Sequence, residues 1–109
     1  MATRTKILVV DSDLDTLSRI YLALVHRNYK TEASDKEEEI PERIKRLKPA
    51  LVILGKKEYF IYRDKLKTPC IVLVNNDETE TFNTPEDVFI LKKPVQLESL
   101  YQKIEELVY

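Results

Sequence analysis

The chain has 109 residues, the length of a single folded domain, and 43% of them are hydrophobic, which is a globular composition rather than a disordered one. Its 18 basic and 19 acidic residues give a formal net charge of -1, which excludes nucleic-acid or lipid binding by bulk electrostatics. The longest apolar run, residues 20–25, is far shorter than the ~20 residues of a membrane-spanning helix, and no leader-like segment precedes Lys6. We expect one cytoplasmic domain over residues 1–109.

Two residue counts limit the chemistry further. Cys70 is the single cysteine, so an internal disulfide and a zinc cage are both excluded, and we expect it to be an inert core thiol. Gly55 is the single glycine, and phosphate-binding loops need several glycines to bring backbone N–H groups onto the phosphate. We therefore expect no cofactor and no metal.

In the first half of the chain, strands and helices are predicted in alternation. Residues 6–10 form a continuous apolar run typical of a strand buried on both faces, and apolar residues at helical spacing follow over 14–27. A weak alternation predicts a strand at 29–33. Regular helix is expected only from about Pro41 to Leu47, because proline is tolerated at the start of a helix and not inside it.

The second half continues the pattern with one exception. Residues 51–54 and 70–74 are predicted buried strands, and the segment between them has room for about two helical turns. Residues 88–91 are a fifth strand candidate, and 97–108 carry the clearest amphipathic helix. The third helix, in residues 55–69, is therefore expected to be short, and residues 75–87 lack the apolar stripe of a helix, so the fourth is expected to be short or missing.

Alternating strands and helices predict a doubly wound α/β fold with a parallel sheet and helices on both faces. In such sheets the reactive crevice lies beyond the carboxyl ends of the strands. The candidate site therefore consists of the residues that follow each predicted strand, which are Asp11, Ser12, Asp13, Gly55, Asn75 and Lys93.

These strand ends resemble the receiver domain of two-component response regulators, the CheY-like family, in register over nearly the whole chain. The resemblance is carried by residues 6–13, by Asn28-Tyr29, by residues 48–54 and by residues 91–94, which end in Lys-Lys-Pro. It implies a flavodoxin-like fold with strand order 2-1-3-4-5. It also implies a carboxylate after the third strand that accepts a phosphoryl group, with Mg²⁺ held by that carboxylate and by acidic residues after the first strand.

The chain departs from the family pattern at the positions that carry this chemistry. Gly55 stands where the phosphoacceptor should be and has no side chain, so the nucleophilic oxygen is missing. Ser12 leaves Asp11 as a poor magnesium site, and Asn75 replaces the expected hydroxyl, while Lys93 remains. The resemblance is therefore to a degenerate pseudo-receiver, a non-enzymatic module that binds another signalling protein or domain without being phosphorylated.

Other readings of these residues stay open. A displaced acceptor, Asp13 or Ser12, could work with Lys93 in a functional receiver. The crevice could bind a small anion through Lys93 and Asn75, since the missing carboxylate leaves space there. Asp11 and Asp13 could be a remnant metal site, although a helix cap combined with an ion pair to Lys93 is the favoured interpretation.

A shortened helical layer predicts an interaction face as well. Apolar side chains of the fourth and fifth strands should be under-covered on the side of the middle helices, and exposed apolar patches on monomers mark interfaces. The candidate residues are Tyr59, Phe60, Phe82 and Phe89, and the occupant would be a signalling partner or a second copy in a homodimer.

Overall fold

A computed structural model describes residues 5–75 and 86–108 of the chain. Five strands, four α-helices and two short 3₁₀ segments make up this part. In chain order they are β1 (Lys6–Val10), α1 (Leu14–His26), β2 (Lys30–Ser34), η1 (Glu37–Glu39), α2 (Ile40–Leu47), β3 (Leu51–Gly55), α3 (Lys56–Tyr62), η2 (Arg63–Lys65), β4 (Cys70–Val74), β5 (Val88–Lys92) and α4 (Leu97–Val108).

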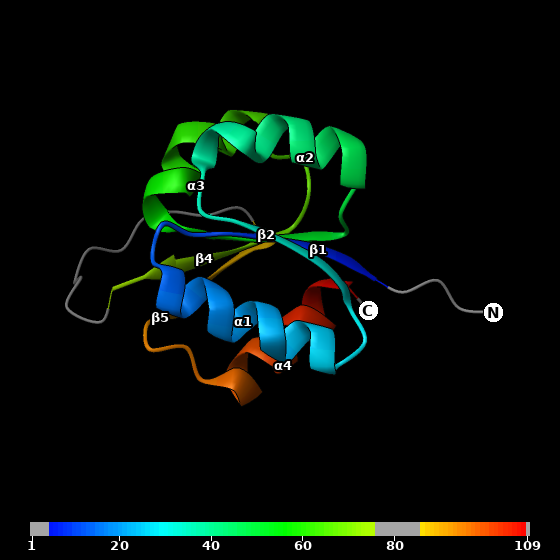
Figure 1. The fold of residues 1–109 in the computed structure, drawn as a ribbon, viewed down its shortest axis with the longest axis vertical. Helices are drawn as coiled ribbons and strands as arrows, with labels where there is room; N and C mark the ends of the chain where they lie inside the picture. The colour runs from blue at the N-terminus through cyan, green and yellow to red at the C-terminus, as the bar shows by residue number, and fades with distance from the viewer. Residues whose placement is uncertain (1–4, 76–85, 109) are drawn as a thin grey trace.

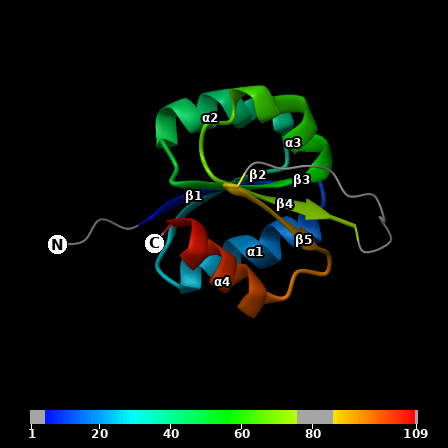
Figure 2. The same ribbon diagram turned by 180° about the vertical axis from the view of Figure 1, so that it is seen from behind.

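The five strands form one parallel sheet with the order β2-β1-β3-β4-β5. Helices α2 and α3 cover one face of this sheet, and α1 and α4 cover the other, as Figure 1 shows. The view from behind in Figure 2 shows β5 at the edge opposite β2. The predicted doubly wound fold and its strand order are confirmed.

The sequence explains the ends of α1. The Asp13 carboxylate accepts hydrogen bonds from the backbone N–H groups of Asp15 (3.1 Å) and Thr16 (3.4 Å), which satisfies donors that a helix N-terminus leaves without partners. At the other end Asn28 adopts a φ of 68°, a left-handed conformation that asparagine tolerates better than most residues. The chain can therefore turn directly from α1 into β2.

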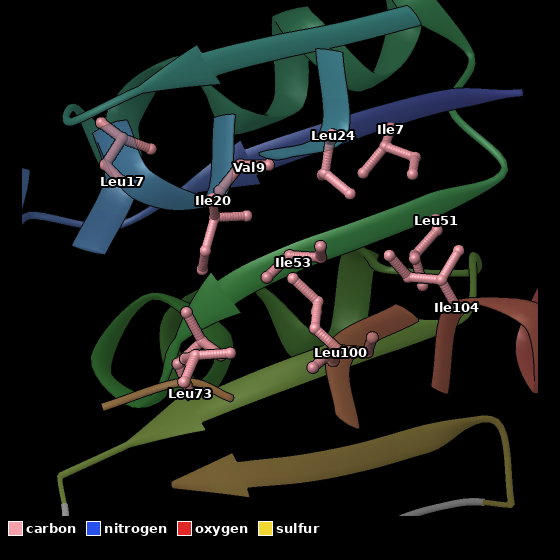
Figure 3. Close-up of a cluster of buried hydrophobic side chains, with 12 residues drawn as sticks. Ile7, Val9, Leu17, Ile20, Leu24, Leu51, Ile53, Leu73, Leu100 and Ile104 are labelled. Carbon is pink, nitrogen blue, oxygen red and sulfur yellow. The ribbon is translucent and has the colours of Figure 1, made fainter. Parts of the chain in front are cut away.

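Side chains alternate between the two faces of the sheet and build two separate cores. One core lies under α1 and α4, and Figure 3 shows its central residues, including Ile7, Ile53 and Leu100, all fully buried. The other lies under α2 and α3 and includes Leu8, Val52 and Leu54. Strands β3 and β4 are buried along their whole length because they contribute to both cores.

The helical layer over the second core is reduced, as predicted. Helix α3 has only 7 residues and continues into the 3₁₀ turn η2. Helix α2 carries Pro41 in its first turn, as expected, and η1 precedes it. The prediction of a short or missing fourth helix between β4 and β5 falls mainly on residues 76–85, and these, with Phe82, lie outside the described residues.

Candidate functional site at the carboxyl end of the sheet

The carboxyl ends of β1, β3, β4 and β5 meet around a pocket of about 460 Å³. The fold brings together there five of the six residues selected from the sequence, namely Asp11, Ser12, Gly55, Asn75 and Lys93. The sixth, Asp13, does not line the pocket, but its carboxylate pairs with Lys93, which does. The remaining lining comes from the start of α3 and from β4, with Lys56, Lys57, Glu58, Phe60 and Leu73.

Lys93 is held between two carboxylates. Its ammonium nitrogen lies 3.0 Å from Oδ2 of Asp11, which is 2% exposed, and 3.7 Å from Oδ2 of Asp13. The backbone N–H of Lys93 donates a 2.8 Å hydrogen bond to the carbonyl of Val74, and its bond to Pro94 is cis. The predicted ion pair between Asp11 and Lys93 is therefore present, and it ties the end of β1 to the end of β5.

Asp13 acts mainly as a cap. Besides the two backbone hydrogen bonds at the start of α1, its Oδ2 accepts a 2.8 Å hydrogen bond from the Thr16 hydroxyl. That hydroxyl is the largest influence that lowers the pKa of Asp13, and the charge of Lys93 adds to it. The Asp13 backbone N–H donates in turn to Oδ1 of Asp11 (2.9 Å). A carboxylate stabilised by these donors is a weakened nucleophile.

The position after β3 holds a carboxyl group, but not one attached to Gly55. A β-carbon built on Gly55 would overlap Oε1 of Glu58 and would lie 3.4 Å from Cδ of Glu58 and 3.5 Å from Cγ of Asp11. The Glu58 carboxyl therefore fills the space that a side chain at position 55 would need. It arrives from the first turn of α3, three residues later in the chain.

The environment of Glu58 favours its protonated form. The side chain is 3% exposed, and burial is the first cause that raises its pKa, with the negative charges of Asp11 and Glu37 adding to the effect. Although Glu58 lines the pocket, so small an exposed fraction leaves little of its carboxyl open to a phosphodonor. Glu58 thus occupies the acceptor position without supplying an acceptor.

Sequence reasoning missed Glu58. Glu58 lies in the segment between the predicted strands at 51–54 and 70–74, where no role is predicted for it. The signal that could have found it is its position in the first helical turn after Gly55, because the first turn of a helix leads back over the strand end that precedes it. A side chain at position 55 would have excluded it.

The magnesium ion that the family resemblance implies does not fit the residues present. Asp11 and Asp13 are engaged by the Lys93 ammonium, Gly55 provides no ligand, and burial favours a proton on Glu58. Within residues 5–75 and 86–108, no group of three or more His, Cys, Asp or Glu side chains is placed to hold a metal ion.

No helix in the same part of the chain has the length and apolar character to cross a membrane.

Phe82 of the expected interaction face lies outside the described residues, and the other three do not gather on one surface. Tyr59 is 5% exposed and belongs to the core under α2 and α3, where its ring meets Phe60 edge-on at 5.7 Å. Phe89 packs against the other core, and the ammonium of Lys103 lies 4.5 Å from its ring. Of the three described residues, only Phe60, at 39%, is exposed.

Comparison with known proteins gives a likeness of structure alone. The N-terminal domain of the nisin resistance regulator NsrR, a lantibiotic response regulator, superimposes with a TM-score of 0.80 at 18% identity over 98% of this chain and 100% of that one. A putative response regulator from Chloroflexus aurantiacus gives 0.79 at 17% identity over 97% and 98%. A response regulator receiver protein from Pseudomonas putida gives 0.75 at 21% identity over 97% and 99%.

No protein-family model and no curated protein matches the chain. The identities to the solved structures lie below the level that establishes common function, and fold alone does not fix activity. What the superpositions establish, over nearly the full length on both sides, is that this chain has the fold of response-regulator receiver domains.

Proposed function

We propose that the chain is a phosphorylation-independent signalling module, a pseudo-receiver that acts by binding another protein. The single observation that carries this proposal is the placement of the Glu58 carboxyl in the space beside Gly55. Phosphoryl transfer needs an accessible nucleophilic oxygen at that point. Here the strand end has no side chain, and the carboxyl that takes its place is buried, which raises its pKa.

The rest of the pocket supports the same proposal. Lys93, which would meet a phosphoryl group, is already paired with Asp11 and Asp13. A phosphoryl group would have to compete with two carboxylates for one ammonium, and it would bring further negative charge toward them. The ion pairs of Lys93 therefore oppose the binding of a phosphoryl group in this pocket.

The test is incubation with acetyl phosphate and Mg²⁺ followed by intact-mass measurement, with an active receiver domain treated in parallel. We expect no gain of a phosphoryl group. A stable gain would revive the alternative of a displaced acceptor. Ser12→Ala and Asp13→Asn variants would then locate it, since a serine phosphate survives hydroxylamine and an acyl phosphate does not.

One observation favours a second candidate function, the binding of a small anion. The pocket has a volume of about 460 Å³, within the range of ligand sites, and Lys56 and Lys57 line it together with Lys93. Thermal unfolding with inorganic phosphate, nucleotides and small dicarboxylates tests this function. A rise in Tm that Lys57→Gln abolishes would support it, whereas a flat response would exclude it.

A further inference from the structure

Strand β2 forms one edge of the sheet, and within the described residues it pairs only with β1. The Lys30 N–H donates to the residue before β1 (2.9 Å), and the Ser34 carbonyl accepts from Asp11 (3.2 Å), so these two residues turn their main-chain groups inward. Main-chain direction alternates along a strand. Thr31 and Ala33 therefore turn their N–H and C=O groups outward, toward the open edge.

An apolar groove of about 500 Å³ lies beside this open edge. Leu17, Tyr21 and Leu22 of α1 line one side of it, Ala33 lies on the strand, and Arg43 of α2 reaches it from the other face of the sheet. Leu22 is 61% exposed and Tyr21 is 36% exposed. An open row of backbone groups thus runs directly beside exposed apolar side chains.

Helix α1 extends this apolar surface beyond the groove. Leu14 and Val25, 58% and 44% exposed, fall on the same side of the helix as Leu22, because residues three, four, seven and eight apart share a helix face. The adjoining side of α1 packs on the core through Leu17, Ile20 and Leu24. The helix therefore carries a second apolar stripe that the rest of the domain does not cover.

We infer that the β2 edge is a self-association surface, at which two copies of the chain pair β2 against β2 in antiparallel fashion. The twofold axis passes beside Glu32. Thr31 of each copy then exchanges both main-chain hydrogen bonds with Ala33 of the other, which joins the two sheets into one. The exposed stripe of α1 meets its counterpart across the same axis.

Charges on the α2 face complement one another in this register. Lys30 of one copy lies diagonally across from Glu32 of the other, a separation that a lysine side chain spans. The two Glu32 side chains face each other, but each is already bound by Arg43 (2.9 Å) and Arg46 (2.7 Å). The arginines offset the repulsion between the two glutamates. A lysine on an edge strand usually opposes pairing with another strand, but here Lys30 gains Glu32 of the other copy as a partner.

The side chains on the α1 face permit the same approach. Thr31 and Ala33 are the residues of β2 that point to this face, because their register partners Ile7 and Val9 belong to the core under α1. Both are small, so α1 of one copy can approach α1 of the other. Because Thr31 and Ala33 flank Glu32, the twofold register sets a small residue opposite a small residue in both hydrogen-bonded pairs, which favours a second copy over an unrelated strand.

Hydrogen exchange on the unmodified chain tests the pairing directly. We expect the outward amides of Thr31 and Ala33 to exchange quickly in dilute solution and to become protected as the concentration rises. The amides of Lys30 and Glu32, which face β1, should not depend on concentration. Sedimentation equilibrium over the same range should show a monomer–dimer equilibrium. A chain that stays monomeric at millimolar concentration, or a dimer whose Thr31 and Ala33 amides remain unprotected, overturns the inference.

Matched variants locate the surface. Leu22→Glu and Lys30→Glu should each weaken dimerisation by about tenfold or more, since one introduces a charge into the apolar stripe and the other opposes Glu32 with a like charge. Ile61→Glu and Lys65→Glu make the same changes on exposed residues of α3 and η2, and should leave the dimer constant unchanged. Equal weakening by both pairs, or capture of a different protein's strand without self-association, would refute the pairing. The result does not depend on whether the pocket can be phosphorylated.

Discussion

The Glu58 carboxyl occupies the place of the side chain that Gly55 lacks. The two residues are three positions apart, at the end of β3 and in the first turn of α3. Because Gly55 has a φ of -69°, its backbone conformation does not require glycine. Position 55 requires a small residue because the Glu58 carboxyl lies beside it, and the Glu58 carboxyl can lie there because Gly55 has no side chain.

The first prediction concerns Gly55→Ala. The new methyl group should push the Glu58 carboxyl out into the pocket, where water lowers its pKa toward the ordinary value. The free energy of unfolding should change by no more than about 1 kcal/mol, because the displaced group is the end of a flexible side chain. Titration of the Glu58 carboxyl by NMR measures the effect. Ser12→Ala, in the same pocket, is the control, and an unchanged titration in Gly55→Ala would contradict the assigned contact.

The second prediction concerns stability against pH. Burial raises the pKa of Glu58 in the folded chain above its ordinary 4.5, so its protonated form favours folding. The stability it contributes is complete below pH 4.5 and is lost as the pH rises through the folded pKa. Glu58→Gln removes this dependence. The difference in unfolding free energy between Glu58→Gln and the unmodified chain should therefore grow with rising pH, which urea titrations at a series of pH values measure.

Acidic groups elsewhere act in the opposite direction and provide the comparison. Hydrogen bonds from Arg46 to Glu32, and from Ser34 to Glu39, are the first causes that lower the pKa of each carboxylate. Their stabilisation is present above their ordinary pKa and is lost as the pH falls through the folded value. The unmodified chain and Glu58→Gln both retain Glu32 and Glu39. Parallel stability curves for the two proteins would show that Glu58 titrates normally.

The third prediction concerns Lys93. Lys93→Met should cost about 2 kcal/mol, because it leaves the buried Asp11 carboxylate without its cation, and side-chain exposures of 17% and 3% make this a largely buried pair. Adding Asp11→Asn should recover part of the loss. A double-mutant cycle by chemical denaturation measures the coupling. Independent, additive effects would mean that the ion pair does not stabilise the fold.

The fourth prediction concerns the cap of α1. Asp13→Ala should destabilise the chain by about 1 kcal/mol, since it removes the acceptor for two backbone N–H groups and for the Thr16 hydroxyl. Asp15→Ala, in the first turn of the helix, should cost less than half as much because it keeps the cap and removes a charge that favours the helix dipole. Thermal unfolding distinguishes the two. Equal losses would assign the stabilisation to charge rather than to capping.

The fifth prediction concerns Cys70. Burial, followed by the nearby charge of Asp87, raises the pKa of this thiol to about 12, so almost no thiolate is present at neutral pH. Iodoacetamide should modify Cys70 only as fast as the chain unfolds, and urea should accelerate the reaction to the rate of the denatured chain. Rapid labelling of the native protein at neutral pH would show that the strand opens locally.

The fold was predictable because hydrophobic pattern reflects burial directly. Residues 51–54 and 70–74 read as strands buried on both faces, and they are the middle of the sheet. The boundaries of β2 were displaced by one residue, since an edge strand buries too little to give a clear pattern. The expected interaction face stays a prediction, and the sequence does not distinguish Tyr59, which packs inward, from Phe60, which is exposed.

The sequence alone determined the α/β architecture, the residues at the strand ends and the absence of a side chain at position 55, because these depend on residue type and on periodicity along the chain. Only the tertiary structure decided that Glu58 fills the vacant position and that Lys93 is shared by Asp11 and Asp13. These relations depend on where three separate strand ends meet in space. Lys93 lies far from Asp11 and Asp13 in the chain, and although Glu58 is only three positions from Gly55, the direction of its side chain is set by packing, which a single sequence does not display.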